Sequence, residues 1–109
     1  MKISFKRKGS LLTVQLDGEL DQHCAGEIRC AIDARIKSES RIKTLLIDLE
    51  KVSFMDSSGI GVILGRYRLM RDLGGELNIT NAQKTVEKLL RLSGVYSLLD
   101  MKRRGRANG

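Results

Sequence analysis

Two neighbouring serines stand where a strand-like run gives way to a helix-like run. Ser57 and Ser58 follow Asp56 and precede apolar residues at helical spacing. The first N–H groups of a helix have no partner within it, and together with the positive end of the helix dipole they favour an anion, including a phosphate on a serine side chain. The pattern predicts a phosphorylation switch. The alternative is a structural cap, because Asp56 or Ser57 could simply accept hydrogen bonds from those N–H groups.

The elements that must position these serines follow from hydrophobic periodicity. Strict alternation predicts a hairpin of residues 3–5 and 12–16 around Gly9 and Ser10, and a near-continuous apolar run at 45–49 predicts a central strand, covered on both sides or flanked by helices. Asp21 could cap a helix whose apolar stripe is Cys24, Ile28, Ala31, Ile32 and Ile36. Later elements are a helix over 60–70 ended by Gly74 and Gly75, a strand at 76–79, a helix over 86–90 closed by Gly94, and a last strand at Leu98 and Leu99. Strands and helices that alternate in this way predict an α/β domain.

Three glycines fall inside the helix that follows the serines. Each of Gly59, Gly61 and Gly65 costs on the order of 1 kcal/mol relative to alanine in a helix. Their concentration indicates close approach of another backbone or side chain. The neighbour could be the sheet beneath the helix or a partner above it, and the sequence leaves both open.

The same segment carries a resemblance to a known family. The run from Phe54 to Tyr67, Phe-Met-Asp-Ser-Ser-Gly-Ile-Gly-Val-Ile-Leu-Gly-Arg-Tyr, and the Gly-Glu-Leu-Asp of residues 18–21 resemble the anti-sigma factor antagonists of the STAS family, most of all the sporulation type. The resemblance extends from the first strands to Val95. It implies a single STAS-type domain of the α/β class, with a small mixed β-sheet and helices packed mainly on one face.

The resemblance also implies a partner-switching cycle. The unmodified protein would bind an anti-sigma factor that is itself an ATP-dependent serine kinase, and the sigma factor would be released. The kinase would phosphorylate Ser57, because the modified serine of the family directly follows the aspartate, and a serine phosphatase would restore the active form. The expected partners are the nucleotide-loaded kinase and the phosphatase, with no direct nucleic acid, no membrane and no cofactor.

Family members bring the segment at 19–21 to the same edge of the sheet as the serines, so the resemblance implies one recognition surface. Glu19 and Asp21 match acidic positions that family members turn toward a basic residue of the kinase. From the residues alone, each is an ordinary loop acid or, for Asp21, a helix cap. Ser58 could be a cap or a second hydrogen-bonding group. The residues expected to contact a partner are Glu19, Asp21, Asp56, Ser57, Ser58, Gly59, Gly61 and Arg66.

Phosphorylation would act on binding rather than on folding. A phosphoserine adds about −1.5 to −2 charges at neutral pH, which the N-terminus of its own helix tolerates. Against partner carboxylates or nucleotide phosphates, repulsion and desolvation would cost several kcal/mol, roughly a hundred- to thousandfold in affinity. That range is sufficient for an on/off switch.

Composition indicates one domain. The 109 residues are 41% hydrophobic, which suits one domain. The resemblance implies a STAS domain over residues 1–101, and the cations that follow predict a basic, mobile tail over 102–109. Cys24 and Cys30 fall six apart on different faces of a helix, so neither a disulfide framework nor a metal site is expected, and a reducing cytosol is the expected setting. No apolar run reaches the length of a membrane span, so a soluble, cytoplasmic protein is expected.

Other functions have less support. His23 and Cys24 are adjacent in a helix and point to different sides, so no catalytic pair forms and no enzyme is expected. Lys and Arg number 20 against 13 Asp and Glu, which raises nucleic-acid binding, but four of the seven excess charges fall in the tail and aromatic residues make up only 4%. Within the family, the open alternative is a scaffold or sensor module, or a general-stress antagonist with other partners.

Overall fold

Residues 1–99 of the computed structural model are described here, and they form one four-stranded sheet with helices against it. The strands are β1 (Lys2–Lys8), β2 (Leu11–Leu20), β3 (Thr44–Met55) and β4 (Glu76–Thr80), and the helices are α1 (Ala25–Ser38), α2 (Ser57–Asp72) and α3 (Lys84–Ser93). The predicted hairpin, the central strand and the helix after the serines are thereby confirmed.

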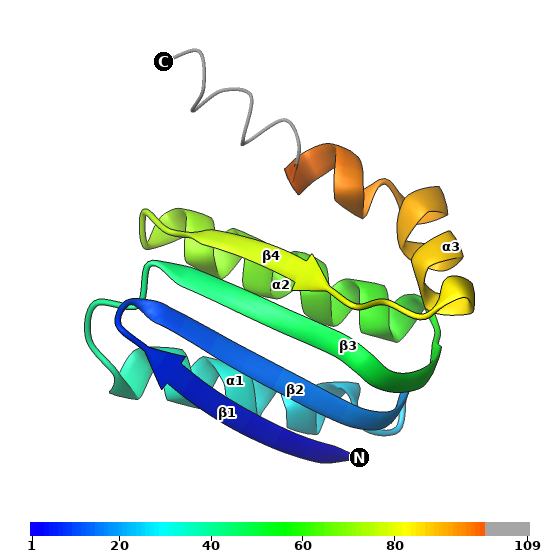
Figure 1. Ribbon diagram of the computed structural model, residues 1–109, viewed down its shortest axis with the longest axis horizontal. Helices are drawn as coiled ribbons and strands as arrows, with labels where there is room; N and C mark the ends of the chain where they lie inside the picture. Colours follow the sequence, from blue (N-terminus) through cyan, green and yellow to red (C-terminus); the bar gives the residue numbers. More distant parts are fainter. Residues whose placement is uncertain (100–109) are drawn as a thin grey trace.

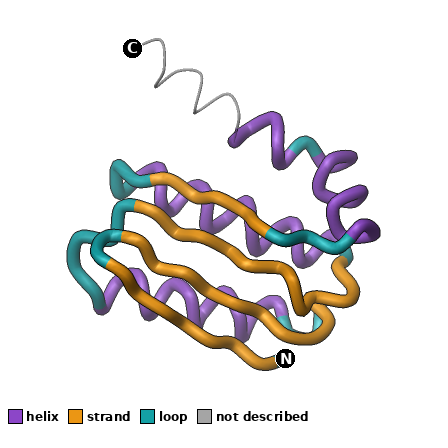
Figure 2. Tube along the Cα trace, viewed as in Figure 1, coloured by secondary structure: helices purple, strands orange, loops and turns teal. Residues whose placement is uncertain are grey.

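The sheet is mixed, with the strands in the order β1-β2-β3-β4. β1 pairs antiparallel with β2, whereas β2 with β3 and β3 with β4 are parallel. The carboxyl ends of β2 and β3 therefore lie at one end of the sheet, and each leads there into a helix (Figure 2). The hairpin turn and the loops before β3 and β4 lie at the opposite end. We call these the switch end and the far end.

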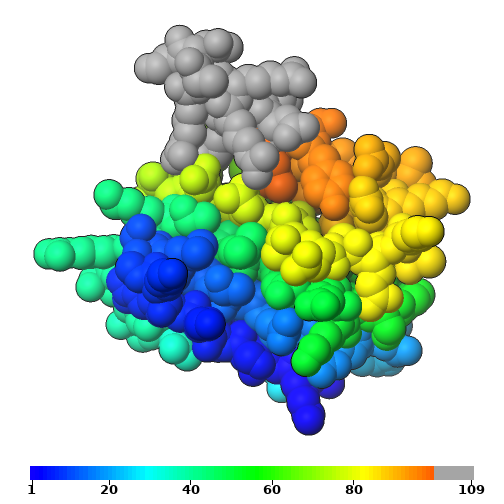
Figure 3. Space-filling view, viewed as in Figure 1, coloured from blue at the N-terminus to red at the C-terminus, as the bar shows by residue number. Residues whose placement is uncertain are grey.

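α1 and α2 cover one face of the sheet, and within residues 1–99 no helix crosses the other face (Figures 1 and 3). Over residues 11–16 of β2 and 44–49 of β3, buried residues on the covered face alternate with half-buried residues on the open face. β3 shows why the apolar run at 45–49 did not require two covered faces: Leu45, Ile47 and Leu49 are buried, but Leu46 and Asp48 lie on the open side. The buried side chains of the sheet and helices form one core.

The end of the described chain differs from its prediction. α3 ends at Gly94, whose φ of +84° closes the helix as expected. Leu98 and Leu99, however, do not form a strand, because residues 95–99 are helical and bury Val95 and Leu99, which are one helical turn apart. The expected domain boundary at 101 and the basic tail at 102–109 lie outside the described residues. Within residues 1–99, no helix combines the length and apolar character needed to cross a membrane.

Candidate partner-docking site at the start of α2

Asp56 is the cap of α2. One carboxylate oxygen, Oδ1, accepts the backbone N–H of Ser58 at 2.8 Å and that of Gly59 at 3.3 Å, and the backbone of Asp56 is extended, with φ −116° and ψ −169°. These bonds satisfy two of the N–H groups that a helix start leaves without partners. The choice between Asp56 and Ser57 as the cap is thus decided in favour of Asp56.

The same carboxylate also ties the two loops of the switch end together. Its second oxygen, Oδ2, accepts the backbone N–H of Gln22, which belongs to the loop between β2 and α1, at 3.2 Å. The backbone N–H of Asp56 in turn donates to the carbonyl of Leu20 at 3.4 Å. The expected adjacency of residues 19–21 to the serines is therefore present in the fold.

The serines differ in exposure. Ser57 is the first residue of α2 and is exposed, and among residues 1–99 its hydroxyl has no hydrogen-bond partner. Ser58 is half-buried and its N–H is held by Asp56. Because the cap is supplied by Asp56, the Ser57 hydroxyl is left accessible for chemistry with another molecule.

The glycines of α2 serve two different purposes. Gly59 is buried, and a Cβ there would lie 2.5 Å from Cγ of Met55 and 2.9 Å from the carbonyl oxygen of Leu20, so the sheet beneath requires glycine. Gly61 and Gly65 would meet nothing within 4 Å. Neither is needed by the fold, and Gly61 leaves bare helix backbone beside the serines.

A shallow groove runs between α1 and α2 next to this bare backbone. Its volume is about 280 Å³, and its walls include Gly26 and Arg29 of α1 and Ser58 and Gly61 of α2. The small residues keep the groove open on both sides. Arg29 places a cation one turn into α1, close to the N-terminus of α2.

The acidic residues of the first loop lie where expected, but one prediction needs correction. Glu19 is exposed and Asp21 is half-buried at the end of β2. Asp21 does not cap α1, which begins only at Ala25. Its carboxylate accepts the N–H of His23 at 2.9 Å, and its carbonyl accepts those of Cys24 and Ala25, so Asp21 closes the turn that precedes the helix.

Arg66 was expected at the partner surface, and the structure places it beneath that surface. Its side chain is about 7% exposed and its Nε lies 2.7 Å from Oδ1 of Asp33 on α1, an ion pair without the alignment of a hydrogen bond. Burial lowers the pKa of Arg66 and the charge of Asp33 opposes that shift. Arg66 therefore holds α2 against α1.

Sequence reasoning missed Phe54. Its side chain is 49% exposed although it lies in β3, and its register partner is Glu19. The pairing of β2 with β3 is irregular between Gly18 and Glu19, which breaks the alternation just before the site. A large apolar side chain thus stands beside the acidic loop, and the only sequence signal for it was its place in the motif.

The chain's histidine and its two cysteines lie in or just before α1. His23 and Cys30 are exposed, Cys24 is half-buried, and both cysteines are free. The thiol of Cys24 donates to the carbonyl of Glu19 at 3.0 Å. Within the described part of the chain, no group of three or more His, Cys, Asp or Glu side chains could hold a metal ion.

Comparison with known proteins gives consistent matches. The family model of the STAS domain matches residues 2–105. The chain is 35% identical over 99 residues to an anti-sigma F factor antagonist of Paenibacillus polymyxa, covering 91% of this chain and 84% of that protein. The structure of the anti-sigma factor antagonist SpoIIAA in its unphosphorylated form superposes with a TM-score of 0.74 at 34% identity, covering 85% of this chain and 81% of that one. The phosphorylated form of SpoIIAA, a Bacillus cell fate determinant, gives 0.68 at 32% identity, covering 88% and 86%.

Proposed function

This chain belongs to the STAS domain family, among its anti-sigma factor antagonists, and from that membership we propose that the switch end docks an anti-sigma factor under the control of phosphorylation at Ser57. The unmodified protein binds the anti-sigma factor and the sigma factor is released. The anti-sigma factor in this proposal is also a serine kinase, and a separate phosphatase reverses the modification. The chain itself is a ligand and a substrate rather than an enzyme.

The observation that carries this proposal is the exposed hydroxyl of Ser57 beside a helix cap that does not need it. Asp56 supplies both acceptor contacts at the start of α2, so Ser57 has no structural duty there. A kinase can reach an exposed serine at the first position of a helix without unfolding the domain. The solved phosphorylated form of the relative SpoIIAA supports the same type of modification here.

The covalent steps are simple displacements at phosphorus. The Ser57 oxygen forms a bond to the γ-phosphorus of ATP, the bond from that phosphorus to the bridging oxygen breaks to release ADP, and a base of the kinase takes up the hydroxyl proton. In the reverse half of the cycle, water attacks the phosphorus of phosphoserine, and Ser57 and inorganic phosphate are formed. Phosphorylation needs ATP, and the anti-sigma factor must share a compartment with its sigma factor, so we propose that the cycle operates in the cytoplasm.

Charge is the physical basis of the switch in this proposal. Glu19, Asp21 and Asp56 already give the switch end three carboxylates. A partner that binds it must present cations there, or tolerate anions at close range. Adding about −1.5 to −2 charges at Ser57 brings strong repulsion wherever the partner holds a nucleotide phosphate or a carboxylate opposite it. Glu19 and Asp21 then act as contacts that orient the partner.

The test is phosphorylation by an anti-sigma F factor kinase with ATP, followed by mass spectrometric location of the phosphate. We expect one phosphate, on Ser57. Ser57→Ala should incorporate none and still bind the kinase, whereas Ser58→Ala, the matched control, should still accept one phosphate, on Ser57. Phosphate on Ser58, or on neither serine, would overturn the assignment.

Binding provides an independent test. Ser57→Asp should bind the nucleotide-loaded kinase on the order of tenfold more weakly than Ser57→Ala, because aspartate carries only part of the charge of a phosphate. Equal affinities of the two variants would contradict a switch that acts through charge. If an anti-sigma factor of the general stress response binds and no anti-sigma F factor does, the proposed partner is wrong. The role of Ser57 is then tested separately, by the position of the phosphate.

A further inference from the structure

The far end of the molecule carries a hollow that the proposed switch does not use. It lies between the ends of α1 and α2 and the loop that leads into β3, and its volume is about 540 Å³. Concave sites of about 300–1,000 Å³ are the size that holds a few side chains or a small ligand. This hollow is therefore large enough to receive part of another chain.

The floor of the hollow is apolar. Ile36 and Ile42 are buried at its base, Leu69 is half-buried, and Leu73 is 59% exposed at the end of α2. An exposed leucine alone is unremarkable on a protein surface, but here four aliphatic side chains line one concavity. Water contacts apolar surface that a partner could cover.

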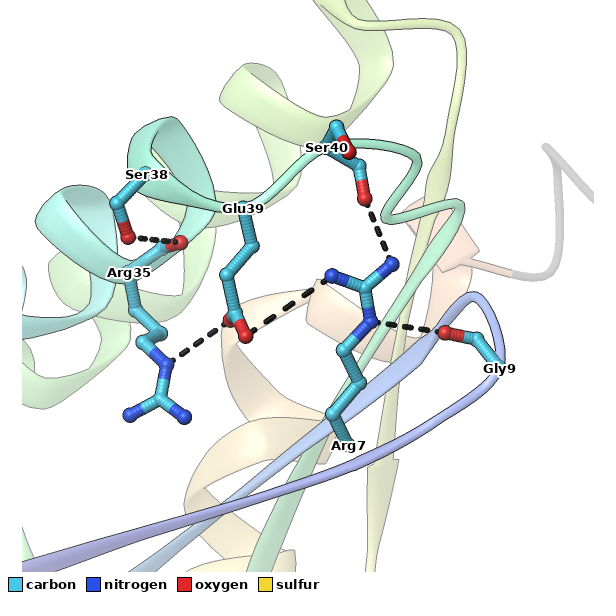
Figure 4. A network of polar contacts seen from close by, with 6 residues as sticks. All are labelled: Arg7, Gly9, Arg35, Ser38, Glu39 and Ser40. Atoms are coloured by element: carbon cyan, nitrogen blue, oxygen red, sulfur yellow. Dashed lines mark hydrogen bonds and ion pairs between the residues drawn. The ribbon is translucent and has the colours of Figure 1, made fainter.

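The rim of the hollow is basic. Lys37, Arg41 and Lys43 line it, and Glu39, which among residues 1–99 is its one acidic lining residue, is already paired with arginines. Glu39 lies 2.9 Å from Nε of Arg35 and 3.9 Å from a guanidinium nitrogen of Arg7 (Figure 4). Because Arg7 and Arg35 already pair with the carboxylate of Glu39, the three cations of the rim are left with an excess of positive charge. At the end of α2, the formal charges of Arg71 and Asp72 cancel.

Helix ends explain only part of this charge. Arg35 and Lys37 stand in the last turn of α1, where cations offset the helix dipole. Arg41 and Lys43 lie beyond the helix in the loop, and their exposed side chains satisfy no helix terminus. Arg7 fixes this loop through its bond to the carbonyl of Ser40 at 2.6 Å and, through Nε, holds the hairpin turn at Gly9 (Figure 4). The basic rim is thus held in place by a network of its own.

We propose that this far-end hollow docks an acidic amphipathic segment of a protein partner, with apolar side chains on the floor and carboxylates at the rim. Charge complementarity selects the acidic segment. The concave aliphatic floor selects a peptide over a nucleic acid, whose recognition uses phosphate contacts and aromatic stacking, and over a flat lipid surface.

The position of the hollow gives it a separate role. β2 runs from one end of the sheet to the other, and its ten residues span about 30 Å. A phosphate at Ser57 is screened over that distance at physiological salt, where the Debye length is about 8 Å. A segment bound at the far end would therefore stay attached while the switch end releases its own partner.

The probe for this site is a synthetic helical peptide with leucines at helical spacing on one face and glutamates elsewhere. Fluorescence anisotropy with the full chain should give saturable binding. The double substitution Arg41→Glu with Lys43→Glu should weaken binding at least tenfold. Leu73→Asp, which places a carboxylate on the apolar floor and leaves all three rim cations in place, should weaken it similarly. The matched control, Lys84→Glu with Lys88→Glu, makes the same change in net charge on exposed residues of α3 and should bind as the native chain does.

Several outcomes would overturn the proposal. Absence of binding would do so, as would equal weakening by the α3 control, which would indicate unspecific attraction to a basic protein. Tighter binding of duplex DNA or of anionic vesicles with the same residue dependence would assign the hollow to those ligands instead. Circular dichroism of each variant verifies the fold, and Ser57→Asp should leave peptide affinity unchanged, which separates this test from that of the switch.

Discussion

The carboxylate of Asp56 reaches across the switch end and accepts the backbone N–H of Gln22 at 3.2 Å. Because the same side chain also caps α2, one residue fixes both loops that form the candidate docking surface. The positions of Ser57 and of the acidic loop are therefore set together, by backbone groups that do not depend on any partner.

Removing this carboxylate should destabilise the domain. Asp56→Ala leaves three backbone N–H groups without their acceptor, and loss of a helix cap typically costs about 0.5–2 kcal/mol. Asp56→Asn keeps one acceptor oxygen for α2 and should cost less. Urea denaturation measures both. An alanine variant as stable as the native chain would show that the cap contributes nothing.

The glycines of α2 should respond in opposite directions. Gly59→Ala should destabilise by about 1–3 kcal/mol, since the added methyl would collide with Met55 and with the Leu20 carbonyl. Gly65→Ala, which meets open space, should stabilise by up to about 1 kcal/mol through helix propensity. Thermal unfolding of the pair gives the comparison. A loss of stability at Gly65 equal to that at Gly59 would contradict it.

Gly61→Ala separates stability from binding. Its methyl would also meet open space, so stability should rise slightly. The methyl would, however, project beside the groove that contains Ser58, and affinity for an anti-sigma factor should fall. Calorimetric titration against the kinase checks this, with Gly65→Ala as the control. Unchanged affinity of Gly61→Ala would exclude contact of the partner with this turn of α2.

Breaking the Asp33–Arg66 pair should cost more than removing a surface arginine. Arg66→Met leaves Asp33, whose side chain is 25% exposed, without its cation, and we expect a loss of about 1–3 kcal/mol. The control Arg68→Met removes an exposed arginine from the same helix and should be nearly neutral. Combining Arg66→Met with Asp33→Ala should recover part of the loss. A single variant as stable as Arg68→Met would contradict an important pairing.

The stability of the domain should fall in alkali through Tyr96. Burial raises the pKa of its hydroxyl above the ordinary value of 10.0, Glu87 adds to the shift and Arg91 opposes it. The unfolded state therefore loses the phenolic proton at lower pH than the folded state, so stability is fully present below pH 10 and declines as pH rises through the folded pKa. The stability difference between the native chain and Tyr96→Phe should be constant below that pH and shift against the native chain above it. A constant difference throughout would refute the shift.

Local pattern was enough for much of this fold. The hairpin follows from alternation of apolar and polar residues, and the start of α2 follows from its capping residue. The end of α3 follows from a glycine, which readily adopts a positive φ. Each of these signals acts within a few residues. The predicted start of α1 at Asp21 is wrong, because Asp21 forms a turn before the helix. The sequence did not distinguish the two because a turn and a helix cap at Asp21 satisfy the same N–H groups. The strand predicted at Leu98 and Leu99 is wrong because two apolar residues are too few to distinguish the spacing of a strand from that of a helix. The helical spacing shows only when Val95 is included.

In the candidate site too, residues placed by nearby sequence could be predicted, and residues placed by packing between elements could not. Ser57 and Asp56 could be named from the sequence because they stand where a strand pattern gives way to a helix pattern, and the acidic loop was expected beside them from the family resemblance. Arg66 could not be placed correctly, since its burial depends on Asp33 from another helix. The far-end hollow was equally out of reach, because its aliphatic floor comes from two helices and a loop that meet only in the folded chain.

The carboxylates of Glu19, Asp21 and Asp56 lie at the switch end and the cations of the basic rim lie at the far end, so these two groups of charges set up an electric dipole along the strands. In the field of a large charged complex, such a molecule rotates before it touches anything, with its acidic pole toward positive surfaces. Encounter would then begin in a favourable orientation. A phosphate on the acidic pole would increase the dipole moment, so its effect on binding must come from close contact with the partner's anions and not from this orientation.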